Sequence, residues 1–391
     1  MAYAVNPSIS RIEAPPIAEA MTWVRQGPRN RDLLNLCQAV PSYPPAEAMQ
    51  DEIARAAKVA DTSLYTDIFG LPELRQALAD NMAADYRGQV AADDVAITSG
   101  CNQAFCAAIM ALARHGDNVI LPVPYYFNHQ MWLDMLGVEA RHIAAITDAG
   151  AWPLVETAAS AIDAKTRAIV LCSPNNPTGS IYPPEVIGGF FDLARARGIA
   201  LIIDETYKDF RPSPAPLHSL FAEPGWRDTF IQLYSFSKVF AMTGYRAGSI
   251  IAGAKVLSEI EKILDCMAIC APHISQRAVL YGLAHLEGWK NDKKAVMLAR
   301  AAALREAFTR RDLRYRLVSA GAYFAYVEHP FPNETAKQVA QRLAGEHDLL
   351  CLPGSMFGPG QERYLRIAFA NVEANLMPDV AARLIESQGS T

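Results

Sequence analysis

Seven short apolar runs between residues 95 and 253 alternate with longer stretches of helical periodicity, and this alternation limits the possible folds more than any other feature. The runs are VAITSG, NVILPV, EARHIAA, RAIVLCSP, ALIIDETY, FIQLYSFS and AGSIIAG. Unbroken Val, Ile and Leu runs are typical of strands that are buried on both faces. Because helical patterns separate these runs, we expect a mainly parallel seven-stranded sheet that is covered by helices.

The last of these runs has a connection that is too short for a parallel strand. It begins at Ala247, only nine residues after Lys238, whereas a parallel crossover needs about a dozen residues or more. We therefore expect one antiparallel strand in the sheet. The fold class is α/β, with a three-layer large domain.

Several segments outside the strands have the length, pattern and end signals of helices. The sequence predicts helices at QAFCAAIMALARH (103–115), PEVIGGFFDLARARG (184–198), AKVLSEIEKILDCMA (254–268) and KKAVMLARAAALREAFTRRD (293–312). The last of these leads to strands near GAYFAYVE and YLRIAFA. We expect residues 46–285 to form the large domain, and residues 1–45 and 286–391 to form a smaller α+β domain.

Charge and cysteine content exclude several classes of function. The chain of 391 residues has a net charge of -5 and no long Lys or Arg run, so it lacks the clustered positive charge that nucleic acids and anionic membranes attract. No stretch reaches the ~18 apolar residues of a membrane span. The seven cysteines lack paired zinc-finger spacing, so we expect reduced thiols, no bound metal and a cytoplasmic protein.

Polar side chains gather where the predicted strands end, which is where open α/β sheets bind their ligands. The polar segments are Gly100–Gln103 after VAIT, Asn175 and Asn176 after IVLCSP, Asp204 and Tyr207 in IIDETY, and the serines and lysine of SFSK. Taken singly, NNPTG could be an ordinary turn and SGCNQ a helix start. Their shared position at one edge of the sheet favours a functional site.

Two cationic side chains and one carboxylate lie in apolar segments of the sequence. A charged group in such surroundings needs a specific partner or a chemical role. Asp204 ends a buried strand, so its charge needs a cation. Burial favours the neutral amine of Lys238, and a neutral amine is the nucleophile that forms Schiff bases with carbonyl groups. Arg246 keeps its proton and should face a permanent anion. Phosphate suits it, because Ser235 and Ser237 are close in sequence and the amides of Cys101 and Asn102 open a helix.

A phosphate, an aldehyde and a protonatable ring nitrogen are together the groups of pyridoxal 5'-phosphate. The alternative is that Lys238 and Arg246 form structural ion pairs with Asp204 and Asp209. This alternative explains neither the serines nor the amide-rich turn. The sequence therefore indicates a pyridoxal-phosphate site.

The motifs resemble those of the class I and II aminotransferases, which are fold-type I pyridoxal-phosphate enzymes related to aspartate aminotransferase. SFSKVFAMTGYRAG is similar to the lysine signature of that family, NNPTG to its asparagine motif and DETY to its aspartate and tyrosine motif. SGCNQA resembles the phosphate turn, and YLRIAFA resembles the C-terminal arginine strand. The five motifs occur in the family order, and the resemblance covers nearly the whole chain.

This resemblance implies the catalytic residues. Lys238 would hold the cofactor as a Schiff base and would carry the proton between the substrate Cα and the cofactor C4'. Asp204 would keep the pyridine nitrogen protonated. Tyr207 and Asn176 would donate hydrogen bonds to the phenolic oxygen of the cofactor.

The resemblance also implies the groups that bind the cofactor and the substrate. Tyr126 would stack on the cofactor ring. Tyr65 would reach the cofactor phosphate of a neighbouring subunit, which makes a homodimer the catalytic unit. Arg366 would clamp the substrate α-carboxylate, because its planar fork matches two carboxylate oxygens. The phosphate itself would lie among Ser235, Ser237, Arg246 and the amides of Cys101 and Asn102.

The substrate loop departs from the family pattern. In CQAVPSYPP, Ala39 occupies the place of a common glycine and Ser42 that of an acidic residue. The Ala39 methyl would narrow the space beside the substrate. His129 and His273 could each meet a substrate side chain or simply fill the packing. No second cation is evident for a distal carboxylate, which disfavours a strict aspartate or glutamate enzyme unless the partner chain or another loop supplies one.

The sequence therefore predicts an aminotransferase that moves the amino group of an L-amino acid to a 2-oxo acid by a ping-pong cycle. A neutral donor side chain, aromatic or sulfur-containing, is favoured. The alternative is a carbon-sulfur β-lyase with the same cofactor and scaffold. A ligand-sensing regulator would need a DNA-binding segment ahead of this fold, and the first forty residues are expected to be too short for one.

Overall fold

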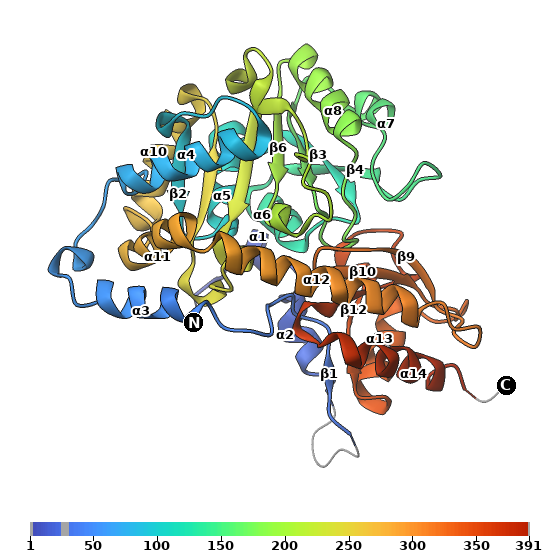
Figure 1. Cartoon of the computed structure of the whole chain (residues 1–391). Helices are drawn as coiled ribbons and strands as arrows, with labels where there is room; N and C mark the ends of the chain where they lie inside the picture. The colour runs from blue at the N-terminus through green and yellow to red at the C-terminus, as the bar shows by residue number, and fades with distance from the viewer. Residues whose placement is uncertain (1–2, 25–30, 390–391) are drawn as a thin grey trace.

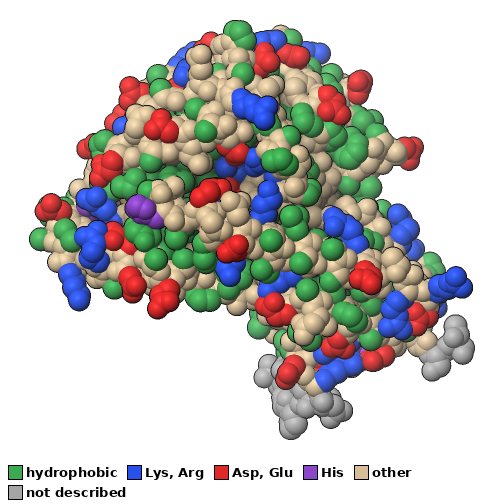
Figure 2. All heavy atoms as spheres, viewed as in Figure 1, with side chains coloured by type: hydrophobic (Ala, Val, Ile, Leu, Met, Phe, Trp, Pro, Cys, Tyr) green, Lys and Arg blue, Asp and Glu red, His purple; other side chains and the backbone are tan. Residues whose placement is uncertain are grey.

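The structure is a computed structural model that describes residues 3–24 and 31–389. Figure 1 shows a larger part built around a central sheet and a smaller part that holds the C-terminal elements. Helix α12 (Glu287–Ala307) runs across both parts. On the face shown in Figure 2, Lys and Arg side chains are interspersed with Asp and Glu side chains.

The central sheet has seven strands, as predicted, in the order β2-β8-β7-β6-β5-β3-β4. Only β8 runs antiparallel to its neighbours, so the prediction from the short connection after Lys238 is confirmed. The strands are β2 (Val95–Thr98), β3 (Asn118–Val123), β4 (Glu139–Ala144), β5 (Thr166–Cys172), β6 (Ala200–Asp204), β7 (Phe230–Ser235) and β8 (Gly248–Ile251).

Strand β4 lies at one edge of the sheet and is less buried than the other strands. It pairs only with β3 among the strands of this sheet. Most of its residues are exposed or half-buried, and Ile143 is the buried one. The other edge strand, β2, is buried throughout, so the edge position alone does not account for the exposure of β4.

Helices cover both faces of the sheet, and alternate strand residues point to opposite faces. In β6, Leu201 and Ile203 join one core cluster, whereas Ile202 joins the other. Helices α4 (Pro72–Tyr86), α8 (Pro184–Arg197) and α11 (His273–His285) contribute to the first cluster. Helices α5 (Cys101–Leu112), α6 (Phe127–Leu136) and α10 (Ala254–Ala268) contribute to the second. Asp204 has the same parity as Ile202, so its side chain points toward α5 and α6.

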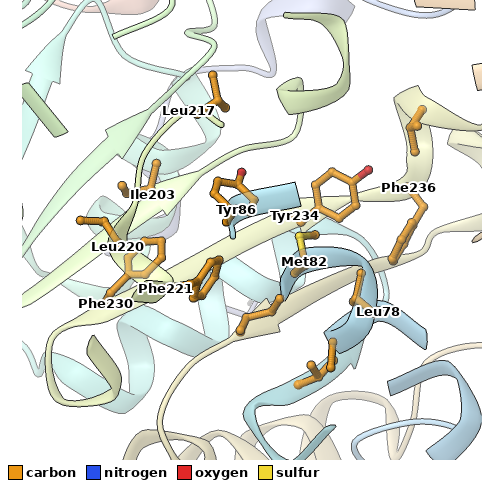
Figure 3. Packing of buried hydrophobic residues seen from close by; sticks show 14 of the residues in the cluster. Leu78, Met82, Tyr86, Ile203, Leu217, Leu220, Phe221, Phe230, Tyr234 and Phe236 are labelled. Atoms are coloured by element: carbon orange, nitrogen blue, oxygen red, sulfur yellow. The ribbon is translucent and has the colours of Figure 1, made fainter. Parts of the chain in front are cut away.

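Figure 3 shows part of the first cluster, in which side chains of α4 lie beside those of the sheet and of the loop before β7. The labelled residues are Leu78, Met82, Tyr86, Ile203, Leu217, Leu220, Phe221, Phe230, Tyr234 and Phe236. Fully burying an aliphatic or aromatic side chain contributes roughly 1.5–3 kcal/mol. This apolar packing holds the strand ends, and therefore the site, in place.

The predicted helices are present, with differences at their ends. Helix α10 has the predicted bounds, and α8 begins at Pro184 and is followed by Gly198 in a left-handed conformation (φ 64°). Helix α5 begins at Cys101 rather than at residue 103. Helix α12 begins at Glu287 and ends at Ala307, whereas the prediction was 293–312. Helix α11 ends at His285, so Leu286 alone separates the two helices, and Gly288 lies inside the first turn of α12.

The smaller part is α+β, as predicted. A four-stranded sheet has the order β12-β13-β10-β9, and β1 pairs with β11 in a separate two-stranded sheet. The predicted strands near GAYFAYVE and YLRIAFA are β10 and β13, whereas β1, β11 and β12 were missed because two residues are too short for a periodic pattern. The elements are β1 (Leu34–Asn35), β9 (Arg316–Gly321), β10 (Phe324–Glu328), β11 (Leu349–Leu350), β12 (Leu352–Pro353), β13 (Tyr364–Ala368), α13 (Ala336–Glu346) and α14 (Met377–Glu386).

The N-terminal segment packs onto the smaller part. Helix α2 (Pro16–Met21) contacts β12, and β1 pairs with β11. The other helices of the first half are α1 (Pro7–Ser10), α3 (Glu47–Ala56) and α7 (Val155–Ala161). These contacts agree with the expected small domain, although the boundaries at residues 45/46 and 285/286 stay a prediction.

In the part of the chain that is described, no helix is both long and apolar enough to cross a bilayer. All seven cysteines are free thiols. The cytoplasmic location stays a prediction.

Candidate active site

A cleft of about 540 Å³ lies at the ends of the central strands, beside the smaller part and the N-terminal segment. It brings together nearly all of the residues that the sequence singled out. Those that line it are Ala39, Cys101, Asn102, Tyr126, Asn176, Asp204, Tyr207, Ser235, Ser237, Lys238, Arg246 and Arg366. They come from every third of the chain, so the fold creates a single site from distant segments.

Lys238 lies on the short helix α9 (Phe236–Val239), which follows directly after β7. Its Nζ donates a hydrogen bond to the carbonyl oxygen of Ala39 at 2.5 Å. Burial lowers the pKa of the Lys238 amine to about 8, and the positive charges of Arg246 and Arg366 act in the same direction. A larger fraction of neutral amine is therefore present near neutral pH than for an ordinary lysine, which favours attack on a carbonyl group.

Asp204 ends β6 and is buried. His129 Nε2 lies 3.2 Å from Asp204 Oδ2, and the amide of Thr206 donates to Asp204 Oδ1 at 3.0 Å. Burial by itself would raise the pKa of the Asp204 carboxyl, but His129 and the Thr206 groups outweigh it and leave this pKa below its ordinary value. The structure thus holds an ionised carboxylate at the floor of the cleft.

The contacts of His129 and Thr206 with Asp204 were not predicted from the sequence. His129 was expected to meet a substrate side chain or to fill the packing. It is buried, and its ring stacks on Phe105 at 4.1 Å and lies edge-on to Tyr126 at 5.2 Å. No local sequence pattern indicates this contact, because it depends on how α6 is placed relative to the end of β6 in the folded chain.

One end of the cleft has the features of an anion site. Helix α5 begins there without a side-chain cap, and Gly100 precedes it with φ 88°. A Cβ at Gly100 would overlap the guanidinium of Arg246, so the backbone can approach this side chain only because residue 100 is glycine. Free N–H groups at a helix start and an arginine together bind phosphate well.

Two serines complete this end of the cleft. The hydroxyl of Ser235 accepts from the amide of Ser237 at 3.2 Å, and Arg246 Nη1 lies 3.5 Å from Ser237 Oγ. Arg246 also donates to the carbonyl oxygen of Thr243 at 3.0 Å. These bonds hold the guanidinium beside the start of α5, so the donor set fits a phosphate monoester.

Arg366 lies on β13 at the other side of the cleft and is only 2% exposed. Its guanidinium lies between the rings of Phe324 and Phe357, at 5.2 and 5.0 Å. It donates to Asn176 Oδ1 at 3.2 Å and to the carbonyl oxygen of Cys37. Its Nε is buried without a hydrogen-bond partner among the described residues.

Burial lowers the pKa of Arg366 to about 10, so the group remains a cation at neutral pH. An arginine that alternates with apolar residues on a strand could by pattern alone face solvent. The structure shows that it faces inward. A buried cation with an unused donor fits a carboxylate.

Aromatic side chains form the walls between these two ends. Tyr207 is buried and packs near Tyr323 at 5.3 Å and Phe324 at 5.1 Å. Burial raises the pKa of the Tyr207 phenol well above its ordinary value, so this phenol is a hydrogen-bond donor. Tyr126 directly precedes α6 and lines the cleft beside Phe127.

Tyr65 and His273 are not part of this cleft. Tyr65 is 74% exposed on the loop after α3. His273 Nδ1 lies 3.2 Å from the carbonyl oxygen of Leu64, so the histidine is packed against this loop. Within one chain, neither side chain lies at the cleft.

The substrate loop is held by an ion pair of the smaller part. The hydroxyl of Ser42 donates to Glu373 at 2.9 Å and accepts from Arg300 Nη2 at 2.7 Å. Arg300 also pairs with Glu373. Ser42 therefore has a structural contact in place of the acidic side chain that the resemblance predicts, and Ala39 lines the cleft.

A seven-stranded sheet with one antiparallel strand, and a cleft that pairs a buried lysine with a carboxylate, an anion site and a buried arginine, define a fold-type I pyridoxal-phosphate-dependent enzyme. Residues 31–384 match the profile of the family described as aminotransferase class I and II. The chain belongs to this family, and it is an aminotransferase that depends on pyridoxal phosphate.

Individual relatives agree with this family. The chain is 29% identical over 308 residues to the putative aminotransferase YugH of Bacillus subtilis, covering 78% of this chain and 79% of the relative. It is 28% identical over 358 residues to the aromatic aminotransferase ISS1 of Arabidopsis thaliana, with 90% and 88% covered. It is 27% identical over 358 residues to the aspartate aminotransferase of Thermotoga maritima, with 90% of each covered. All three relatives are named aminotransferases, so the comparison does not favour the β-lyase alternative.

Solved structures show the same fold. The crystal structure of the Thermotoga maritima aspartate aminotransferase has a TM-score of 0.89 at 25% identity and covers 99% of this chain and 100% of that chain. Bna3p of Saccharomyces cerevisiae, a putative kynurenine aminotransferase, has a TM-score of 0.90 at 19% identity and covers 100% of both. The second likeness is evidence for the fold alone.

Proposed function

We propose that this enzyme moves the amino group of an L-amino acid to a 2-oxo acid by a ping-pong mechanism, with Lys238 as the residue that holds the cofactor covalently. The observation that carries this proposal is the presence of Lys238, Asp204 and Arg366 in one cleft. They supply a nucleophilic amine, a buried carboxylate and a carboxylate-binding arginine. Each is a group that amino transfer requires.

The cofactor would be held at several points by the residues described. Its phosphate would lie among the amides of Cys101 and Asn102 and the side chains of Ser235, Ser237 and Arg246. Asp204 would face the pyridine nitrogen, and Tyr126 would stack on the ring. Tyr207 and Asn176 would donate to the phenolic oxygen. When bound, pyridoxal phosphate supplies an electron sink that stabilises negative charge at the substrate Cα.

Asp204 would keep the proton on the pyridine nitrogen. His129 and the amide of Thr206 lower the pKa of the Asp204 carboxyl and so favour its ionised form. A fixed negative charge in a buried site strongly favours a proton on its partner. The role of His129 is therefore to position and stabilise Asp204.

Lys238 would both attach the cofactor and move a proton. Once an incoming amine has released Nζ, this nitrogen would take the proton from the substrate Cα and deliver it to the cofactor C4'. Its pKa of about 8 leaves a minor but appreciable fraction of the amine in the base form near neutral pH, far more than for an ordinary lysine.

Arg366 would bind the α-carboxylate of donor and acceptor alike. Both substrate classes carry this group, so one arginine can serve both halves of the cycle. The aromatic rings on either side of its guanidinium hold the fork in one orientation. This shared clamp is the physical basis of a ping-pong cycle, in which the two substrates use the same cleft in turn.

We also propose that the catalytic unit is a homodimer, in which Tyr65 reaches the phosphate of the partner's cofactor. The support is its exposure at the surface, away from its own cleft, next to the exposed Leu64. Large apolar side chains that are exposed side by side favour a protein contact.

Incubation of the cofactor-loaded enzyme with an amino donor alone tests the proposed function. We expect the cofactor absorbance to change to that of the amine form, with one equivalent of 2-oxo acid released per subunit and no ammonia. Addition of a 2-oxo acid should reverse the change. Release of pyruvate and ammonia from cystathionine without this spectral change would contradict the proposal.

A further inference from the structure

The cleft has an apolar wall that the proposed cofactor and α-carboxylate contacts do not use. The N-terminal segment contributes Pro15, Pro16 and Ile17 to the lining, and the start of α6 contributes Phe127. Val40 of the substrate loop lines it as well. These side chains offer no charge to a ligand.

This wall is connected to the arginine clamp by direct contacts. The guanidinium of Arg366 lies 5.0 Å from the ring of Phe357, and that ring lies 5.7 Å from the ring of Phe127. Ile17 and Phe127 both pack against the same buried cluster, which contains Phe357. A substrate held by its carboxylate at Arg366 therefore has its side chain within reach of Ile17 and Phe127.

The charges of the cleft point to the same kind of side chain. Among the described residues that line it, the Lys and Arg side chains are Lys238, Arg246 and Arg366. The proposed function uses all three, for the cofactor aldehyde, the phosphate and the α-carboxylate. A second carboxylate on the substrate would lose its hydration against Ile17 and Phe127 without gaining a cation from the lining that this chain supplies, which is unfavourable. An apolar side chain there would leave water and pack.

We infer that the amino donors and 2-oxo acceptors of this enzyme carry an uncharged, mainly apolar side chain, and that Ile17 and Phe127 form the wall that selects it. This inference rests on the proposed function. The inferred side chain is uncharged, whereas several relatives are named aspartate aminotransferases, after a substrate with an acidic side chain.

Binding of carboxylates that cannot react separates the inference from catalysis. Isothermal titration of the cofactor-loaded enzyme with 3-phenylpropanoate, 4-methylpentanoate, succinate and maleate would measure the side-chain preference directly. We expect the dissociation constants of the two apolar monocarboxylates to be at least about tenfold lower than those of the dicarboxylates. A hydrophobic pocket typically separates ligands that differ by one apolar contact by about this factor. Equal or tighter binding of succinate or maleate would overturn the inference and would indicate a cation supplied from elsewhere, such as a partner subunit.

A pair of variants on one helix tests the wall. Ile17→Ser should weaken 3-phenylpropanoate binding several-fold and leave acetate binding unchanged. Ile17→Leu keeps an apolar side chain and should bind 3-phenylpropanoate about as tightly as the wild type. Met21→Ser is the matched control, because Met21 lies on the same helix α2 and is 46% exposed. Unchanged 3-phenylpropanoate binding in Ile17→Ser, or an equal loss for acetate, would contradict the proposed contact.

The two proposals fail in different ways. If phenylalanine and aspartate convert the cofactor to its amine form at equal rates, the proposed function stands and the inference is wrong. If 3-phenylpropanoate binds tightly but no amino acid converts the cofactor, the apolar wall stands and the proposed function is wrong.

Discussion

His129 Nε2 lies 3.2 Å from Asp204 Oδ2, and both side chains are buried. The two residues come from α6 and from the end of β6, which are separated by more than seventy positions in the sequence. A buried carboxylate without a partner would take up a proton. This contact, together with the amide of Thr206, is the reason that Asp204 can remain ionised at the floor of the cleft.

Removal of the His129 contact should shift the pH dependence of the enzyme. In the proposed mechanism the ionised form of Asp204 is the active one, so activity should be present above its pKa and should be lost as the pH falls through it. His129→Leu removes a donor that lowers this pKa. We expect kcat to fall about 10–100-fold, the cost of one hydrogen bond to a buried charge, and the acidic limb of the kcat profile to move to higher pH. A kcat profile with an unmoved acidic limb would show that His129 only fills space, and His129→Gln should restore part of the wild-type profile.

Lys238→Ala should reduce amino transfer by about 10²-fold or more, because the general base and the covalent attachment are both lost. The absorbance of covalently held cofactor should also disappear. Lys262→Ala is the control, because Lys262 is an exposed lysine paired with Glu259. Normal turnover in Lys238→Ala, measured with the same donor, would disprove the assignment.

Arg366→Ala should raise the KM of donors and of acceptors by similar factors, about 10–100-fold, because both lose a charge-assisted bond to their α-carboxylate. Arg366→Lys keeps the charge without the planar fork and should recover only part of the loss. Steady-state kinetics with both substrates would measure this. If both KM values stay at the wild-type level, the carboxylate clamp lies elsewhere.

Gly100→Ala should weaken cofactor binding about tenfold, since a Cβ there overlaps the Arg246 guanidinium and such overpacking typically costs 1–3 kcal/mol, or about 5–150-fold. Gly116→Ala separates overlap from backbone strain. Gly116 has φ 85°, close to the 88° of Gly100, but a Cβ at Gly116 meets no atom within 4 Å. Cofactor titration of both apoenzymes gives the comparison. An equal loss in the two variants would mean that strain alone is responsible.

Tyr65→Ala should weaken cofactor binding about tenfold if its hydroxyl reaches the partner's phosphate. The sharper test is hybrid complementation. When Tyr65→Ala subunits and Lys238→Ala subunits form mixed dimers, one site contains an intact Lys238 and receives an intact Tyr65 from the other subunit. Activity should therefore rise on mixing. Mixed dimers that form without any gain in activity would show that Tyr65 serves no partner site.

The order of the strand-forming runs, the one antiparallel strand and most of the site residues could be predicted from the sequence. Local signals carry this information. Buried strands appear as unbroken apolar runs, and ligand groups of an open α/β sheet follow directly after them, as Asp204 and Asn176 do. The resemblance to a known family added Tyr126 and Arg366, whose individual residues carry no signal of their own.

The sequence by itself thus determined the type of fold and the chemical groups of the site, because hydrophobic periodicity and strand-end motifs depend on neighbours along the chain. Only the tertiary structure decided which groups meet. It places His129 against Asp204, buries Arg366 between Phe324 and Phe357, and brings Ile17 to the cleft. These contacts join residues that are far apart in sequence, so they follow from the packing of whole elements and leave no local pattern.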